Sequence, residues 1–172
     1  MANCCTFTMQ VKGKKNDIIR FYYALTQKGD LWIGRGAAAS IYYDSSASQG
    51  DDHCVVEIDG ECKWSIESAL IDDALSMQEQ KRTGTGCWRL SDPNVNYVTL
   101  PEACEKFHVN MEAFSEELGC EFQEHMSYEN GEFFSEIVDY CEEYDEENDE
   151  YTQEGGFPEW GSFHLMDVLN LS

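Results

Sequence analysis

Acidic side chains crowd one short stretch of the chain, between residues 142 and 154. Like-charge runs of this kind are typical of solvated tails or faces. If a fold holds the carboxylates in place, residues two apart on a strand face lie about 6.6 to 7 Å apart, and residues four apart on a helix about 6 Å apart. Both spacings resemble those between successive phosphates of nucleic acid. The candidate partner-binding residues are therefore Glu142, Glu143, Asp145, Glu146, Glu147, Asp149, Glu150 and Glu154.

The cysteines and histidines do not form a recognisable metal or catalytic motif. The eight cysteines include no Cys-x-x-Cys pair, which argues against zinc. His53 with Cys54, or Cys120 with His125, can be assembled into a thiol–histidine dyad, but burial in a core is the commoner fate of free cysteine. We therefore predict no catalytic residue and a protein that is not an enzyme. A hydrolase using a thiol–histidine or carboxylate pair remains an alternative.

Sites for calcium and for phosphate are equally poor matches. The acidic run has no glycine before Gly155, whereas a calcium loop needs a central glycine for its sharp turn. The stretches 34–36 and 84–86 contain paired glycines but lack the lysine and helix of a phosphate-binding loop. We expect no metal and no cofactor.

The charge of the whole chain excludes several classes of partner. The 172 residues contain 34 Asp and Glu against 11 Lys and Arg, a net charge of −23. Residues 107–172 hold 19 of the acids and no Lys or Arg, so most of the charge lies in this stretch. Such a field opposes direct contact with nucleic acid or anionic lipid and favours a basic nucleic-acid-binding protein as partner.

The chain ends point to a cytoplasmic protein in two parts. The N-terminus lacks the basic and apolar regions of a signal peptide, and no apolar run is long enough for a membrane helix. We therefore expect free, mostly buried thiols.

Residues 1–141 are predicted to form an α+β domain. Residues 142–172 are predicted to form an acidic segment followed by an apolar segment, 157–171, that docks on the core or on a partner.

Hydrophobic periodicity predicts the elements of the first half of the domain. Residues 4–12 alternate as a half-buried strand, and a helix capped by Asn16 is expected to end at Lys28 and Gly29. Short strands are expected at 31–33 and 40–43, with a loop at 45–52. Residues 54–66 are predicted to form a hairpin with a three-residue loop at 59–61.

The second half is predicted to alternate helices and hairpins. Ser65 is expected to cap a helix that ends near Gln80, and residues 81–98 are irregular. Thr99 to Glu102 form a capping-box pattern for a helix through about Phe107. Residues 109–118, which also fit a continued helix, are assigned to a strand. Asn130-Gly131 then predicts a hairpin whose second strand is 133–140. The fold class is α+β, an antiparallel sheet with helices packed on one face.

Several short stretches carry a family resemblance. They are Ala2 to Cys5, Gly60 to Ser65, Leu100 to Ala103, Gly119 to His125 and Asn130 to Glu132. Over residues 2–141 the chain resembles small ferredoxin-like proteins of the YubB type from phages and mobile elements of Gram-positive bacteria. The resemblance implies a ferredoxin-like fold and a mobile genetic habitat, and it implies no catalytic residue. The acidic C-terminal extension predicted from the charge lies beyond the residues that it covers. Mobile elements commonly encode acidic inhibitors of host defence, including anti-CRISPR proteins.

Two functional hypotheses follow. The first is a non-enzymatic nucleic-acid mimic that uses the acidic region from Glu112 to Glu159 to block a host-defence protein in the bacterial cytosol, with a CRISPR effector nuclease as the expected target. The second is a protein–protein adaptor whose apolar segment, Phe157 to Leu171, docks a partner while the acids keep it soluble.

Overall fold

The computed structural model describes residues 4–43, 53–84, 94–145, 150–158 and 160–164. Over these residues the chain is α+β, as predicted, with a large antiparallel sheet and a few helices. The sheet has the strand order β3-β4-β1-β6-β7-β8-β9. Two short strands, β2 (Leu31–Ile33) and β5 (Asn96–Val98), form a separate parallel pair. The loop predicted at 45–52 lies outside the described residues.

Strand β1 (Cys4–Lys14) organises the first half of the sheet. It pairs antiparallel with β4 (His53–Lys63) on one side and with β6 (Asn110–Glu117) on the other, and β4 also pairs with β3 (Ala38–Tyr43). The alternation predicted from the sequence gives β1 one apolar face in the core, where Met9 and Val11 have no exposed surface.

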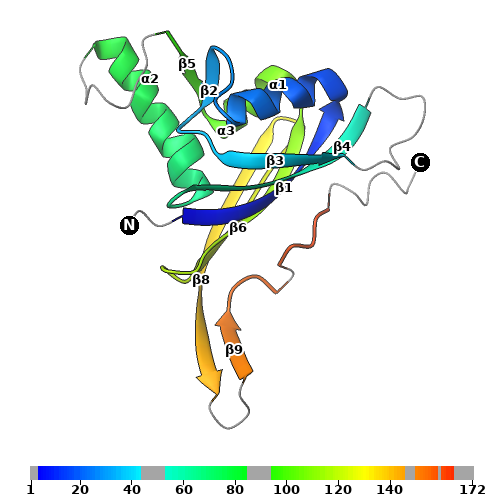
Figure 1. Ribbon diagram of the computed structural model, residues 1–172, viewed down its shortest axis with the longest axis vertical. Helices are drawn as coiled ribbons and strands as arrows, with labels where there is room; N and C mark the ends of the chain where they lie inside the picture. Colours follow the sequence, from blue (N-terminus) through cyan, green and yellow to red (C-terminus); the bar gives the residue numbers. More distant parts are fainter. Residues whose placement is uncertain (1–3, 44–52, 85–93, 146–149, 159, 165–172) are drawn as a thin grey trace.

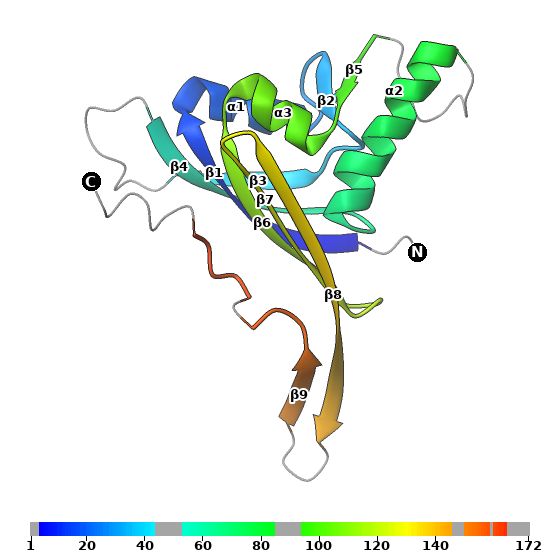
Figure 2. The same cartoon turned by 180° about the vertical axis from the view of Figure 1, so that it is seen from behind.

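The helices lie together on one face of the sheet (Figures 1 and 2). They are α1 (Lys15–Leu25), the π-helical turn η1 (Ser68–Asp72) that continues into α2 (Asp73–Thr83), and α3 (Leu100–Phe107). The apolar sides of α1, η1 and α3 form one core with the facing sides of β1, β4, β6 and β7, whereas Met77 of α2 packs in a second, small cluster with Val95 and Tyr97. We call this side of the sheet the helix face and the other side the open face.

Two predicted helix starts are confirmed by their caps. Thr99 and Glu102 form a reciprocal capping box at the start of α3, and the Ser65 hydroxyl accepts the N–H of Ser68 at 2.9 Å. The helix that begins there continues through Thr83, beyond its predicted end. Helix α1 differs at both ends, because Lys14 occupies the N-cap position and the left-handed residue after the helix is Gln27, with φ 56°.

The predicted hairpin at 54–66 is wrong. Residues 53–63 form the single strand β4, with Asp59 and Gly60 in its middle, paired with β1 on one side and β3 on the other. Gly60 is needed there for close packing, not for a turn, because a Cβ atom would lie 2.7 Å from Cζ of Phe7 and 2.8 Å from the carbonyl oxygen of Ala38. Trp64 lies beyond the strand and is 49% exposed.

The second half of the sheet is a meander of β6, β7 (Phe122–Glu129) and β8 (Glu132–Asp145). The predicted turn is confirmed: Asn130 and Gly131 both have positive φ, as a type I′ turn requires. Strand β8 is longer than predicted. Its first part pairs with β7 as far as Asp139, and its second part pairs with β9 (Glu150–Gly155).

Candidate acidic binding surface

The predicted partner-binding residues lie on and around a two-stranded unit that extends the sheet. It pairs Tyr140 with Gly155 at its base and Asp145 with Glu150 at the last described pair, with unbroken register between them. We call residues 140–145 and 150–155 the acidic hairpin. Six strand residues span about 20 Å at 3.3 Å per residue. The hairpin projects away from the helices and the body of the sheet (Figures 1 and 2).

Five of the eight predicted residues belong to this hairpin, at positions 142, 143, 145, 150 and 154. The register places positions 143, 145, 150 and 154 on one face and position 142 on the other. The side chains of Glu142, Glu143 and Glu154 are exposed. Glu146, Glu147 and Asp149 lie outside the described residues.

The pKa values of two residues at the base of the hairpin report the local field. The pKa of Tyr140 is raised to about 12, first by its burial and then by Glu116, Glu142 and Glu121. The pKa of the Cys141 thiol is also raised, by loss of hydration and then by Glu121 and two acids of the hairpin. Carboxylates from β6, the β6–β7 turn, β8 and β9 therefore converge at this point.

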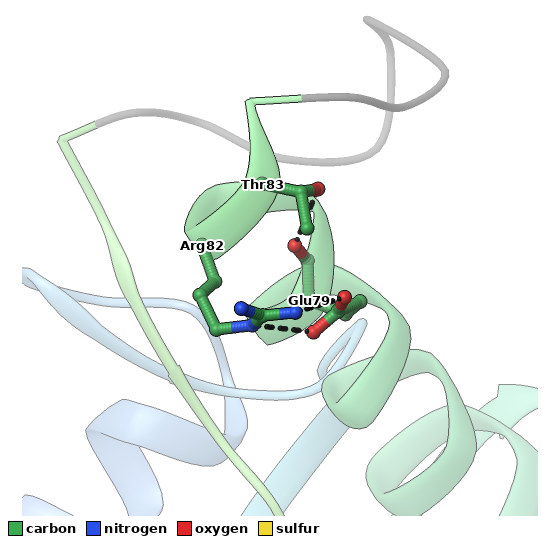
Figure 3. Close-up of polar contacts among 3 residues, drawn as sticks. All are labelled: Glu79, Arg82 and Thr83. Carbon is green, nitrogen blue, oxygen red and sulfur yellow. Dashed lines mark hydrogen bonds and ion pairs between the residues drawn. The ribbon is translucent and has the colours of Figure 1, made fainter.

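The cations that could neutralise these acids lie elsewhere in the sequence, since no Lys or Arg follows Lys106. Ion pairs join Arg20 to Asp17 and Arg35 to Asp73, both before that point. The guanidinium of Arg82 binds both carboxylate oxygens of Glu79, at 2.8 and 2.6 Å (Figure 3). Each of these three arginines is thus paired with an acid that lies outside the acidic hairpin.

The hairpin is tied to the body of the sheet by backbone hydrogen bonds and by one buried ring. The N–H of Tyr140 donates to the carbonyl of Glu121 at 2.9 Å, and the N–H of Gly156 donates to the carbonyl of Asp139 at 3.2 Å. Tyr140 is only 5% exposed. These contacts fix the base of the acidic hairpin, which distinguishes it from a mobile acidic tail that would have to order on binding.

After β9 the chain returns along the open face of the sheet. Phe157, Trp160 and Phe163 pack edge-on against Phe114 of β6, with ring centroids 6.5, 5.3 and 5.2 Å away. The Phe157 N–H donates to the side chain of Gln123 at 3.0 Å. The described part of the apolar segment thus packs on the chain's own sheet, while residues 165–171 lie outside the described residues.

A histidine and two carboxylates lie under this returning segment. The ring of His125 stacks on Phe114 with centroids 4.3 Å apart, and its Nε2 lies 2.9 Å from Glu112. The other oxygen of Glu112 accepts the N–H of His164 at 2.6 Å. On β6, the next carboxylate on the same face, Glu116, accepts from the Gln123 amide at 2.9 Å. Glu112 is 3% exposed, so it holds the segment and is not available to a partner.

A second buried carboxylate, Glu124 on β7, was not among the residues predicted from the sequence. It has no exposed surface and accepts the N–H groups of Ile66 and Glu67, at 2.7 and 3.2 Å, and the hydroxyl of Ser115. Glu124 therefore binds the N-terminus of the helix that begins at Ile66, where the helix dipole favours negative charge. Its parity was visible in the sequence, because it shares a strand face with Phe122 and Met126.

The thiol–histidine pairs considered in the sequence are placed differently. His53 and Cys54 are neighbours on β4, so their side chains leave opposite faces of the strand. Cys120 lies in the β6–β7 turn, whereas His125 is engaged by Glu112 and Phe114. Of the seven cysteines in the described chain three are buried and three exposed, so the expectation of mostly buried thiols is not met.

Over the described ranges, no group of three or more His, Cys, Asp or Glu side chains is placed to hold a metal ion. None of the helices described is both long enough and apolar enough to cross a bilayer. Comparisons with known protein families, with curated proteins and with solved structures found no match.

Proposed function

We propose that this protein is a non-enzymatic inhibitor from a phage or mobile element, which acts in the bacterial cytosol as a nucleic-acid mimic. Its acidic hairpin enters a basic nucleic-acid-binding channel of a host-defence protein, and a CRISPR effector nuclease is the target proposed. The observation that carries the proposal is that five acids lie on a register-paired hairpin with a fixed base, in a stretch of 66 residues without a single Lys or Arg.

The physical basis is electrostatic. Lys and Arg side chains that line a nucleic-acid channel repel one another when the channel is empty, and a row of carboxylates relieves that repulsion as phosphates do. Positions 143 and 145 lie about 6.6 to 7 Å apart on one strand face, close to the phosphate spacing. The pairing of β8 with β9 means that little ordering entropy is lost on binding.

We also propose that the domain has a ferredoxin-like core with an acidic C-terminal extension. Support comes from the strands β3-β4-β1-β6, in which neighbours are antiparallel, with α1 between β1 and β3 in sequence and α2 and α3 between β4 and β6. This is the order of a split β-α-β-β-α-β unit. Strands β7, β8 and β9 then extend the sheet and carry the acidic hairpin.

The test is competition with nucleic acid. A pull-down from host lysate at low and high salt identifies the partner, and the purified partner is then titrated with this protein while binding of its labelled guide or target is followed by anisotropy. We expect the protein to displace nucleic acid and the displacement to weaken steeply with added salt. Displacement that is insensitive to salt would contradict the proposal.

Neutralising the hairpin separates local from overall charge. The hairpin variant carries Glu142→Gln, Glu143→Gln, Asp145→Asn, Glu150→Gln and Glu154→Gln. At about 0.5 to 1 kcal/mol per exposed contact, the five changes should weaken inhibition by about 100-fold or more. The control variant changes net charge equally at five exposed acids remote from the hairpin, by Asp30→Asn, Asp72→Asn, Glu105→Gln, Glu129→Gln and Glu132→Gln. Equal loss in both variants would refute a role specific to the hairpin.

The adaptor hypothesis makes the opposite prediction in the same assay. Deleting residues 157–172 should then abolish partner capture, while the hairpin variant retains it. Phe114 is only 5% exposed beneath this segment, so the deletion uncovers an apolar ring. The fold of the deletion variant is therefore compared with that of wild type by circular dichroism before its binding is measured.

A further inference from the structure

A groove of about 960 Å³ lies on the open face of the sheet, and its described lining includes no residue of the acidic hairpin. Its floor is formed by β1, β3 and β4, and Trp160 and Phe163 of the returning segment form one wall. Tyr42 lies on β3, the edge strand of the sheet, where it also lines the groove and is 55% exposed. A groove of this size accommodates one or two large side chains of a partner, or a small ligand.

Carboxylates from two strands line the groove. Asp59 and Glu61 lie two residues apart on β4, so they share a strand face at about 6.6 to 7 Å, and Glu116 comes from β6. The Thr8 hydroxyl donates to Oδ1 of Asp59 at 2.8 Å, which fixes that carboxylate in the floor. Among the described residues that line the groove there is neither Lys nor Arg; Lys63 follows Glu61 on this face of β4 but lies outside it.

Exposed aromatic rings accompany these acids. Trp160 is 37% exposed, and its orientation is set by Phe114, which it meets at 5.3 Å and 73°. Aromatic faces attract cations, and guanidinium groups stack on them better than ammonium groups do. The same acids would repel a phosphate or a carboxylate ligand, and they would be poorly matched by an apolar one.

We propose that this groove binds arginine side chains of an extended basic segment in a protein partner. One guanidinium stacks on Trp160 or Tyr42 while its N–H groups reach Asp59, Glu61 or Glu116. The site uses no residue of the acidic hairpin, although Glu116 also lies near Tyr140 at the base of the hairpin, and it does not require the partner to be a nuclease. This inference goes beyond the proposed function, because it assigns a second contact surface on the open face. That surface distinguishes arginine from lysine and does not respond to charge alone.

The probe is a short fluorescein-labelled peptide in which arginine alternates with glycine. Its binding to the protein is measured by fluorescence anisotropy at constant ionic strength. Matched peptides carry lysine or neutral citrulline in place of arginine. We expect the lysine peptide to bind about threefold to tenfold more weakly, because it lacks the planar fork, and the citrulline peptide not to bind.

Three variants locate the site. Asp59→Asn combined with Glu61→Gln should weaken the arginine peptide by at least about tenfold. Trp160→Leu should weaken it about threefold to tenfold. Because Trp160 also packs on Phe114, Tyr42→Leu tests the aromatic contribution without touching the returning segment. The hairpin variant described above, which removes five charges elsewhere, should keep most of the peptide affinity.

Each opposite result overturns the proposal. If the groove variants bind normally and the hairpin variant does not, the cation site is the hairpin. If lysine binds as well as arginine and neither aromatic variant changes affinity, the attraction is that of the net charge alone. If spermine displaces the peptide at concentrations well below the peptide's own dissociation constant, the groove takes a small polycation and not a protein segment. Competition with nucleic acid by wild type is measured separately, so failure here leaves the proposed function standing.

Discussion

Replacing Glu124 tests how the sheet is joined to the helical layer. Its carboxylate is fully buried and accepts two backbone N–H groups at the start of the helix beginning at Ile66, together with the hydroxyl of Ser115. Glu124→Ala leaves these donors without an acceptor inside the protein. Each buried group left unsatisfied costs about 1 to 3 kcal/mol, and removal of one side of a buried charged network typically costs about 3 to 5 kcal/mol.

We therefore expect Glu124→Ala to lower the free energy of unfolding by about 3 to 5 kcal/mol, a large part of the roughly 5 to 15 kcal/mol of a typical domain. Glu124→Gln keeps one acceptor oxygen and should cost less, about 1 to 2 kcal/mol. The measurement is urea unfolding followed by circular dichroism, with the m-value checked for constancy.

Glu129→Ala is the matched control, because Glu129 lies on the same strand but is exposed, and its change should stay within about 0.5 kcal/mol. A loss below about 1 kcal/mol in Glu124→Ala would refute the reasoning, since the N–H groups would then have found other partners. So would equal losses for alanine and glutamine, because the retained oxygen would have no value.

Four further predictions concern the helix cap, strand β4 and the returning segment. Thr99→Ala removes the acceptor of the Glu102 N–H and should cost about 1 kcal/mol in thermal or urea unfolding. Burial opposes ionisation of Glu102, but hydrogen bonds from the Thr99 N–H and the Gln78 amide outweigh it and lower the pKa of Glu102 from 4.5. The ionised carboxylate therefore stabilises the fold above pH 4.5, and this stabilisation is lost as the pH falls through the lower pKa of the folded state. The difference in stability between wild type and Glu102→Gln should accordingly shrink in acid. Gly60→Ala should lower the free energy of unfolding by about 1 to 3 kcal/mol, because its Cβ atom would meet Phe7 and Ala38. Gly84→Ala is the comparison: its Cβ atom would meet no atom within 4 Å, but the residue has φ 64°, so it shows the effect of backbone conformation without a steric contact. Phe114→Ala should speed chymotryptic cleavage after Trp160 and Phe163 by about tenfold or more, while an unchanged rate would show that the ring does not hold the segment.

Local signals in the sequence predicted elements whose chemistry is local. The capping box at Thr99, the Asn130-Gly131 turn and the alternation of residues 4–12 each depend on neighbours within a few residues, and all three are confirmed. The hairpin at 54–66 failed because Asp59-Gly60 carries the composition of a turn. What decides the conformation there is a contact with Phe7 and Ala38, distant in sequence, which no local pattern contains.

The candidate surface could be predicted in composition but not in form. The acidic run is visible in the sequence, but its strand pairing is not. That pairing forms because β8 extends beyond Asp139, the residue at which its ladder with β7 stops, and then pairs with β9. The alternation of 122–128 also carried Glu124 on its apolar face, but a buried acid is expected only when donors are known to meet it. Those donors belong to Ile66 and Glu67, 58 and 57 residues away.

One strand, β8, runs without interruption from the sheet into the acidic hairpin, while the return path passes through Gly155 and Gly156, with φ 84° and 78°. Because β8 is continuous, the direction of the described part of the acidic hairpin follows from the twist of the main sheet. A force applied to the hairpin near Asp145 and Glu150 is transmitted along β8 to its ladder with β7, so if a partner binds the hairpin we expect hydrogen exchange in β7 to change as well.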